Sequence, residues 1–296
     1  MGTIALLTLS DHRFVFVCGL QRSGTTMLYR YLDEHPQVSA LSGTARATNE
    51  GQHNQTVYPG DEFHSKGGRF AFRPQARFTE DSPLVTEENR RRLFAEWSRF
   101  WDVSKPYLLE KSPPNLIRTR FLQALFPESY FVVLLRHPVP VTLATQPWGG
   151  DRTHRLVEHW IRAHELLAED VPHLRRVRAV RYEDLVADPD GTLGGVFAFL
   201  GLDDPNPGRA VAEGINPDNF EADRTLRTGV NDKYFEEWRR RRSALPRRLL
   251  YDAIALRYER PVRAFGYSLR DPHALGEPTH PLPGLGASEP AHARVS

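Results

Sequence analysis

An apolar run that leads directly into a loop bounded by glycines constrains this chain more than any other feature. The run is Phe14-Val15-Phe16-Val17-Cys18, and the loop is Gly19-Leu20-Gln21-Arg22-Ser23-Gly24-Thr25-Thr26. Apolar residues, then glycines, then residues that can start a helix predict a strand–loop–helix unit. In such a unit, backbone N–H groups and the helix N-terminus face an anion. The segment therefore predicts a cradle for a phosphate group.

The two glycines of this loop have the spacing of the ATPase P-loop, G-x-x-x-x-G-K-[ST]. Thr25 stands where that motif has its lysine. The missing lysine is the group that reaches the β- and γ-phosphates of a nucleoside triphosphate. We therefore expect a nucleotide whose cleaved bond is not the usual phosphoanhydride.

Strand and helix patterns alternate along the chain. The apolar runs predict strands at Phe14–Cys18, Tyr107–Leu109, Tyr130–Leu135 and Val177–Val180. Helical spacing of apolar residues predicts helices over about 24–34, 112–126, 155–168 and 189–200. This alternation predicts an α/β fold, with a central parallel sheet flanked by helices. Ligands of such sheets bind at the carboxyl ends of the strands.

One domain is expected over residues 1–270. Within it, residues 40–106 are polar and rich in Gly, Pro and Arg, which predicts a loop-rich cap over the nucleotide face. Residues 271–296 are rich in Pro, Gly, Ala and His, which predicts a disordered tail.

The composition narrows the functional classes. A net charge of +2 gives no whole-surface argument for binding nucleic acid or membranes. The apolar stretch Ile4–Leu9 is too short for a signal peptide or a membrane span, and the single cysteine, Cys18, can form no intramolecular disulfide. We therefore expect a cytoplasmic, bacterial protein without an integral membrane segment. His154, His159 and His164 are five residues apart, which puts them on different faces of a helix, so no metal site is expected.

Further segments carry the chemistry when they are taken together with the loop. They are Leu109-Glu110-Lys111-Ser112-Pro113, Leu135-Arg136-His137-Pro138, and Val180-Arg181-Tyr182-Glu183-Asp184-Leu185 with the helix that follows it. In kind and order, these segments resemble the sulfotransferases that use 3′-phosphoadenosine 5′-phosphosulfate (PAPS). The resemblance spans about residues 14–265. It implies a fold like that of P-loop nucleoside triphosphate hydrolases, PAPS as cosubstrate and no metal ion.

The resemblance also implies residues that bind the donor. The 5′-phosphosulfate would contact Gln21, Arg22, Ser23, Gly24, Thr25 and Thr26, with Arg22 near the bridging oxygen that gains charge. Arg136 would bind the 3′-phosphate, for which an arginine fork is well suited. The family's usual serine eight positions later is Ala144 here, and Thr145 is a possible substitute. Tyr182 either contacts the adenine or packs in the core, and Arg227 belongs to a possible second 3′-phosphate loop.

Four residues are candidates for catalysis: Arg22, which would stabilise the leaving oxygen as described above, and Lys111, Glu50 and His53. In relatives with Glu-Lys-(Ser/Thr)-Pro the lysine contacts the sulfuryl group, which assigns that role to Lys111. The base that takes the acceptor's proton would be Glu50, because a partly buried carboxylate can have its pKa raised toward the working pH. His53 is the alternative base.

The acceptor is expected to be a hydroxyl of a small molecule, lipid or glycan. Relatives that sulfate protein tyrosines have a glutamate soon after the first helix, whereas the stretch Val38–Thr44 has no acid. Aromatic residues of the cap and its surroundings either line an apolar acceptor pocket or pack the cap; they are Tyr58, Phe63, Phe70, Phe72, Trp101 and Trp148. Two other functions stay open: a P-loop kinase, and a nucleotide-binding module without turnover.

Overall fold

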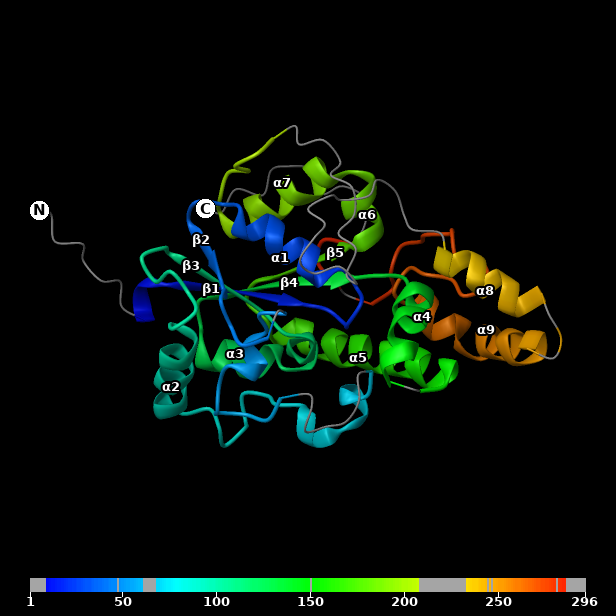
Figure 1. Ribbon diagram of the computed structural model, residues 1–296, viewed down its shortest axis with the longest axis horizontal. Coiled ribbons are helices and arrows are strands. Elements are labelled where there is room, and N and C mark those ends of the chain that lie inside the picture. The colour runs from blue at the N-terminus through cyan, green and yellow to red at the C-terminus, as the bar shows by residue number, and fades with distance from the viewer. Residues whose placement is uncertain are drawn as a thin grey trace, which may run out of the picture.

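A five-stranded parallel sheet forms the centre of the protein (Figure 1). The computed structural model describes residues 9–46, 48–60, 68–149, 151–207, 233–243, 245, 247–280 and 282–285. The strand order is β2-β3-β1-β4-β5. The strands are β1 (Arg13–Cys18), β2 (Val38–Ala40), β3 (Tyr107–Lys111), β4 (Ser129–Leu135) and β5 (Val177–Arg181). The predicted α/β fold with a parallel sheet is confirmed.

Helices cover both faces of this sheet. In Figure 1, α1, α6 and α7 lie above the sheet, while α2, α3 and α5 lie below it. The helices are α1 (Thr25–Asp33), α2 (Glu87–Trp97), α3 (Thr119–Leu125), α4 (Pro138–Gly149), α5 (Thr153–Asp170), α6 (Tyr182–Ala187), α7 (Pro189–Leu200), α8 (Lys233–Ser243) and α9 (Arg247–Arg263). Short 3₁₀ helices connect them at Leu9–Asp11, Gly51–His53, Phe70–Phe72, Pro74–Ala76, Pro113–Ile117 and Val171–His173.

The central strand β1 explains why the chain folds around this sheet. Its side chains alternate between two apolar cores, as the two-residue period of a strand requires. Val15 and Val17 pack with α1 and α7, while Phe14 and Phe16 pack in the core that includes α3 and α5. All four side chains are buried. A strand covered on both faces carries a continuous apolar run, which is why the sequence identified it.

Two local predictions differ from the structure. Tertiary pairing makes Val38–Ala40 an edge strand beside β3, although three residues give no strand pattern of their own. The helix expected over 112–126 is two pieces, Pro113–Ile117 and Thr119–Leu125, which meet at Arg118. The buried side chain of Arg118 donates to the backbone carbonyls of Ala76 and Pro59, at 2.9 and 3.2 Å. The break between the two helical pieces therefore lies at the residue whose side chain contacts the cap.

The disorder predicted for the tail is wrong for the part that the structure describes, 271–280 and 282–285. The amide of Thr279 donates to the carbonyl of Ala264, and the His280 ring stacks on Phe265 at 4.6 Å. Leu282 is buried in the core. These contacts hold a segment of low sequence complexity against the folded domain, which composition by itself does not indicate.

No described helix is both long enough and apolar enough to cross a membrane.

Candidate active site

The predicted cradle lies between β1 and α1, at the carboxyl end of the central strand. The amide and the hydroxyl of Ser23 both donate to the carbonyl of Leu20, at 3.1 and 2.6 Å, and close the turn. Arg22 and Gly24 have left-handed backbone conformations, with φ of 66° and 97°. Helix α1 then starts at Thr25, and the first amides of a helix have no acceptor within it. The loop therefore has the backbone of an anion-binding nest.

Both glycines of the loop are required by close approach. A Cβ atom at Gly19 would lie 2.7 Å from the carbonyl oxygen of Leu134 and 2.8 Å from the Ser23 hydroxyl oxygen. At Gly24 it would lie 2.6 Å from the ring of Tyr182. A side chain at either position would collide with these neighbouring atoms, so both positions need glycine.

Arg136, Tyr182 and Arg22 lie together beside this loop. Arg136 follows β4, and its guanidinium donates to the Arg22 carbonyl at 3.0 Å. Its guanidinium carbon is 4.0 Å from the centre of the Tyr182 ring, and Tyr182 is the first residue of α6, after β5. The segments that the sequence placed at the ends of β1, β4 and β5 are therefore brought together.

Arg136 also carries an unsatisfied donor. Its Nε atom is buried and has no hydrogen-bond partner among the described residues. Buried donors without a partner are costly, so such a group marks a place where a ligand oxygen is expected. A phosphate oxygen fits that requirement.

An exposed tryptophan covers the other arginine of the loop. The Arg22 guanidinium carbon is 3.4 Å from the centre of the Trp148 ring, in the last turn of α4. A cation over an indole face is attracted by the ring quadrupole. The sequence pattern gave no reason to pair these two residues.

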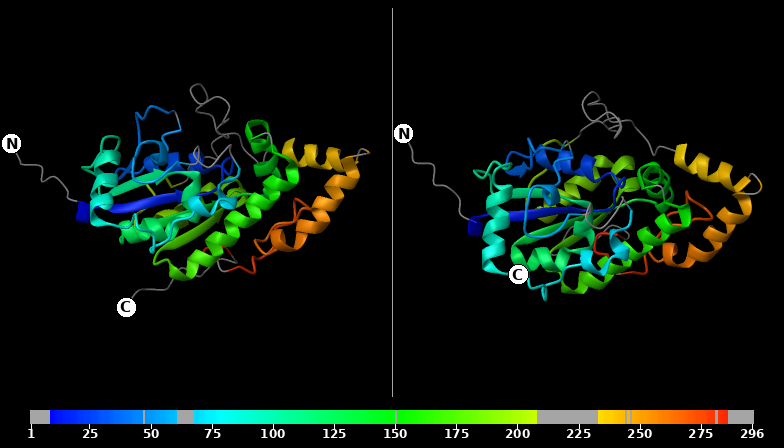
Figure 2. Two further views of the ribbon diagram at one scale, coloured as in Figure 1. Left: turned by 90° about the horizontal axis from the view of Figure 1, so that it is seen from below. Right: turned by 60° about the horizontal axis from the view of Figure 1, so that its bottom comes forward.

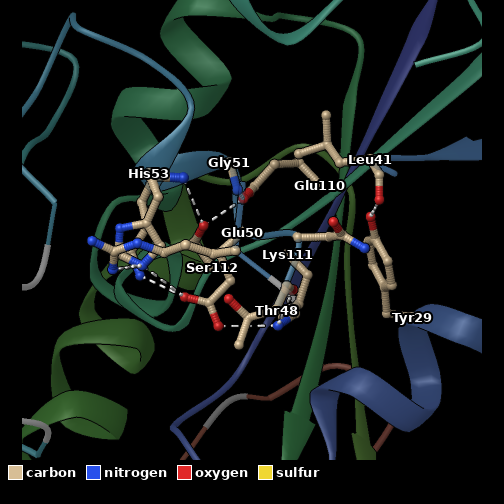
Figure 3. Close-up of polar contacts among 12 residues, drawn as sticks. Tyr29, Leu41, Thr48, Glu50, Gly51, His53, Glu110, Lys111 and Ser112 are labelled. Atoms are coloured by element: carbon tan, nitrogen blue, oxygen red, sulfur yellow. Dashed lines mark hydrogen bonds and ion pairs between the residues drawn. The ribbon is translucent and has the colours of Figure 1, made fainter. Parts of the chain in front are cut away.

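Lys111 and Glu50 form the ionic centre of the site (Figure 3). Val17 of β1 pairs with Lys111 in the sheet register, so Lys111 ends its strand next to the start of the cradle. Its buried ammonium lies 3.1 Å from Glu50 Oε1 and donates to the Thr48 carbonyl at 3.2 Å. The ion pair joins the sheet to the cap.

The expected rise in the pKa of Glu50 is wrong. Burial by itself raises this pKa, but the Lys111 charge and hydrogen bonds from His53, Gln52 and Lys111 outweigh burial and lower it to about 2. Gln52 Nε2 donates to Glu50 Oε2 at 2.7 Å. The carboxylate is therefore ionised at neutral pH, as a proton acceptor must be, but Lys111 makes it a weak base.

The two candidate bases lie side by side. His53 Nε2 is 3.6 Å from Glu50 Oε2 and 3.3 Å from an Arg46 guanidinium nitrogen. Both residues belong to the short segment that enters and forms the 3₁₀ helix Gly51–His53. The sequence interval of three residues thus places a carboxylate and an imidazole in one cluster.

Glu110 is a residue of this site that sequence reasoning missed. It is fully buried and accepts from the Gly51 amide at 2.8 Å, from the Ser112 hydroxyl and from the Asn115 side-chain amide. Burial raises its pKa. Its carboxylate attaches the 3₁₀ helix after Glu50 to strand β3 (Figure 3). The available signal was a carboxylate inside an otherwise apolar strand.

The other residues predicted to bind PAPS, and a neighbouring threonine, lie in different surroundings. Thr145 is buried on α4 and faces Gly68, where an added Cβ would lie 3.3 Å from its methyl carbon. Thr142, one turn earlier, has a buried hydroxyl without a hydrogen-bond partner among the described residues. Arg227 lies outside the described residues.

The described part of the chain contains no group of three or more His, Cys, Asp and Glu side chains that could hold a metal ion.

Comparisons with known proteins agree with this geometry. A family model described as "Sulfotransferase family" matches residues 15–206. Protein-tyrosine sulfotransferase 2 of Gallus gallus is 26% identical over 197 residues, which cover 64% of this chain and 51% of that protein. Nodulation protein NoeE of Sinorhizobium fredii is 26% identical over 263 residues, covering 76% of this chain and 59% of the relative. The chain thus spans about half the length of these curated relatives.

A solved structure has the same fold. It is the sulfotransferase domain of the olefin synthase from Synechococcus, with a TM-score of 0.52 and 21% identity, covering 87% of this chain and 95% of that domain. Because the family model covers more than half of the sequence, this chain belongs to the sulfotransferase family.

Proposed function

We propose that this chain is a PAPS-dependent sulfotransferase, which moves a sulfuryl group to a hydroxyl of a small-molecule, lipid or glycan acceptor. One observation carries the proposal: two sets of residues meet at the carboxyl ends of the strands. An anion-binding loop with Arg136 and Tyr182 lies at the ends of β1, β4 and β5. The buried Lys111–Glu50 pair lies beside it, at the end of β3.

On the donor side, the backbone amides of Gln21–Thr26 bind the 5′-phosphosulfate. Arg136 binds the 3′-phosphate through its unsatisfied Nε and the rest of its guanidinium. Tyr182 contacts the adenosine in this proposal, which the packing of its ring on Arg136 and beside Gly24 supports. PAPS supplies the activated sulfuryl group. The roles of Thr145 and Arg227 stay predictions.

On the acceptor side, Glu50 accepts the proton of the attacking hydroxyl. The acceptor oxygen forms a bond to sulfur, and the bond between sulfur and the bridging phosphate oxygen breaks. The products are a sulfate ester and adenosine 3′,5′-bisphosphate, which keeps the negative charge of the leaving oxygen. Lys111 and Arg22 stabilise the charge that develops on the sulfuryl and leaving oxygens.

The ion pair suggests how a weak base becomes a stronger one. Lys111 lowers the pKa of Glu50 to about 2 while its ammonium lies 3.1 Å from the carboxylate. If the ammonium turns toward the anionic donor, that stabilisation weakens and the pKa of Glu50 rises. Donor binding would then prepare the base, and His53 at 3.6 Å could take over the proton.

Two observations bear on the acceptor class. The stretch Val38–Thr44 has no acid, which favours a small hydroxyl compound over a protein tyrosine. A relative from Mycobacterium tuberculosis, 25% identical over 139 residues, is named omega-hydroxy-beta-dihydromenaquinone-9 sulfotransferase. We therefore place phenols, alcohols and hydroxylated lipids first in an acceptor panel, with glycans and a tyrosine peptide beside them.

Calorimetry tests the donor site. We expect adenosine 3′,5′-bisphosphate to bind more tightly than AMP without Mg²⁺, and Arg136→Gln to remove most of the difference because a charged hydrogen bond to phosphate is lost. Equal affinity for the two nucleotides would contradict the proposal, and Mg²⁺-dependent ATP binding would favour a kinase.

Transfer of labelled sulfate from PAPS tests turnover. Glu50→Gln should reduce kcat about 100-fold or more, the range of general base catalysis, while bisphosphate affinity changes little. Glu88→Gln is the matched control, because Glu88 is exposed in the first turn of α2. Bisphosphate binding without transfer to any acceptor in the panel would instead favour a nucleotide-binding module.

A further inference from the structure

Exposed leucines gather on the hairpin of α8 and α9. Of the six large hydrophobic side chains that are exposed in the described part of the chain, four lie within twelve positions of one another. They are Leu245, Leu249, Leu250 and Leu256, with exposed fractions of 75%, 71%, 54% and 67%. Figures 1 and 2 show that α8 and α9 extend from one end of the molecule, beyond α4. A contiguous exposed apolar patch indicates an interaction surface.

Two of the leucines, Leu249 and Leu256, follow one face of α9. At about 100° per residue, Leu249, Ala253 and Leu256 lie within about 60° of each other around the helix axis. The opposite face holds Tyr251, Ile254, Ala255, Tyr258 and Val262, which are buried against the domain. The helix therefore has two apolar faces, and its fold covers only one of them.

Arginines surround the exposed face. Residues Lys233–Arg263 carry ten basic and four acidic side chains, a net charge of +6 in a chain whose total is +2. Arg260 continues the stripe of Leu249 and Leu256, one turn further along the helix, and Arg257 lies beside it. Some arginines are paired within the hairpin: Arg240 and Arg241 with Glu237, Arg242 and Arg248 with Asp252, and Arg263 with Glu259.

We propose that the exposed face of the α8–α9 hairpin binds the surface of an anionic lipid bilayer. The leucines enter the boundary between headgroups and acyl chains, and the arginines contact the lipid phosphates. This is the arrangement of interfacial amphipathic helices, in which buried apolar area and attraction to anionic lipids add together. The proposal concerns this surface only and does not depend on the proposed function.

Charge favours a membrane over a second copy of the chain. A two-fold symmetric dimer through this face would bring two copies of the same net positive patch together. Like charges across an interface are unfavourable, whereas an anionic bilayer supplies the opposite charge over the whole patch. The net charge of +6 on the hairpin therefore decides between the two partners.

Sedimentation of the full chain with vesicles tests the proposal. We expect binding to vesicles of phosphatidylcholine mixed with phosphatidylglycerol, weaker binding at high salt, and little binding to phosphatidylcholine alone. Changing Leu249→Gln and Leu256→Gln together should reduce partitioning at least tenfold, because two of the apolar side chains that enter the bilayer boundary are lost. Arg260→Gln should reduce it about fivefold, from a loss of about 1 kcal/mol.

Leu275→Gln is the matched control, because Leu275 is also exposed, at 44%, but lies outside the hairpin. It should partition like the unchanged chain, and circular dichroism should show the same fold for all variants. The proposal is overturned if the unchanged chain ignores anionic vesicles, or if the double leucine variant still partitions as well. Sedimentation velocity can give a third contrary result. In that result the chain is a dimer, the leucine substitutions dissociate the dimer, and binding to vesicles does not change.

Discussion

At the scale of single residues, the direction of side chains along β3 decides which carboxylate Lys111 meets. Glu110 is its neighbour in sequence, but successive side chains of a strand point to opposite faces. Glu110 therefore turns toward Ser112, Asn115 and the Gly51 amide, while Lys111 meets Glu50 at 3.1 Å. Lys111 therefore pairs with a carboxylate of the cap and not with its neighbour in sequence.

The Glu50–Lys111 pair predicts a pH-dependent stability. The pKa of Glu50 is about 2 in the folded protein, against an ordinary value of 4.5. The ionised carboxylate therefore stabilises the fold above pH 4.5, and this contribution is lost as the pH falls from 4.5 toward 2. We expect Glu50→Gln to be less stable than the unchanged chain at pH 7, and the difference to shrink by about 1 kcal/mol at pH 4. Urea unfolding at the two pH values measures it.

When the two chains are compared at the same pH, the titrating groups that both contain contribute to both free energies of unfolding, and these contributions largely cancel in the difference. Burial is the main cause that raises the pKa of Glu110, and the resulting contribution, which falls as the pH rises, is present in both chains; the Glu50 charge adds only the smallest of the causes. A difference in unfolding free energy that is the same at pH 7 and pH 4 would show that Glu50 does not have the lowered pKa.

At the scale of elements, the 3₁₀ helix Gly51–His53 is held by its neighbours. Its first amide donates to Glu110 of β3, and the Gly51 carbonyl accepts from the indole of Trp97, in α2, at 3.0 Å. A Cβ at Gly51 would lie 2.6 Å from Glu110 Cγ, so the close contact needs glycine. Three residues have little helical stability of their own, so this framework positions Glu50 and His53.

Glu110→Gln tests this framework. Three donors face the carboxylate, from Gly51, Ser112 and Asn115, whereas a glutamine would turn its own NH₂ toward one of them. We expect the free energy of unfolding to fall by about 1–3 kcal/mol, the cost of unsatisfied buried polar groups. Amide exchange at Gly51 should accelerate, and turnover should fall more than bisphosphate affinity.

The control for this change is again Glu88→Gln. Glu88 is exposed on α2, so its substitution should change stability by no more than about 0.5 kcal/mol. Normal exchange at Gly51 in Glu110→Gln would contradict a positioning role for Glu110.

At the scale of the whole molecule, the C-terminal segment protects the sheet. β5 is an edge strand, and its Ala179 amide donates to the Pro283 carbonyl at 2.6 Å. An uncovered edge strand offers unpaired backbone groups to other chains. The sequence predicted that the domain ends at residue 270. The described residues after 270 instead pack against the sheet and belong to the domain.

Leu282 should contribute to stability through this segment. It is 4% exposed and belongs to the main core, so Leu282→Ala should cost about 2–3 kcal/mol in thermal or urea unfolding. Leu275→Ala, at a position that is 44% exposed in the same segment, should change stability by about 0.5 kcal/mol or less. Equal effects of the two substitutions would mean that the segment does not pack as described.

Particular residues show where prediction from the sequence succeeded. Phe14–Cys18 and Tyr130–Leu135 are long apolar runs, so their burial in a parallel sheet could be predicted, as could the loop bounded by Gly19 and Gly24. Val38–Ala40 could not be, because a three-residue edge strand depends on its pairing with β3. The contact of Trp148 with Arg22 and that of Glu110 with Gly51 were missed, since the partners are remote in sequence.

The sequence by itself determined the α/β fold, the cradle after β1 and the resemblance that the family match confirms, because each depends on short segments whose pattern is local. Only the tertiary structure decided the state of the candidate base. A pKa depends on every charge and donor within a few ångströms. The 3₁₀ turn brings Gln52 and His53 to Glu50, and Lys111 reaches it only once the cap has folded onto the sheet. The same holds for the exposed leucines of α9, because helical spacing gives two apolar faces and packing decides which one is buried.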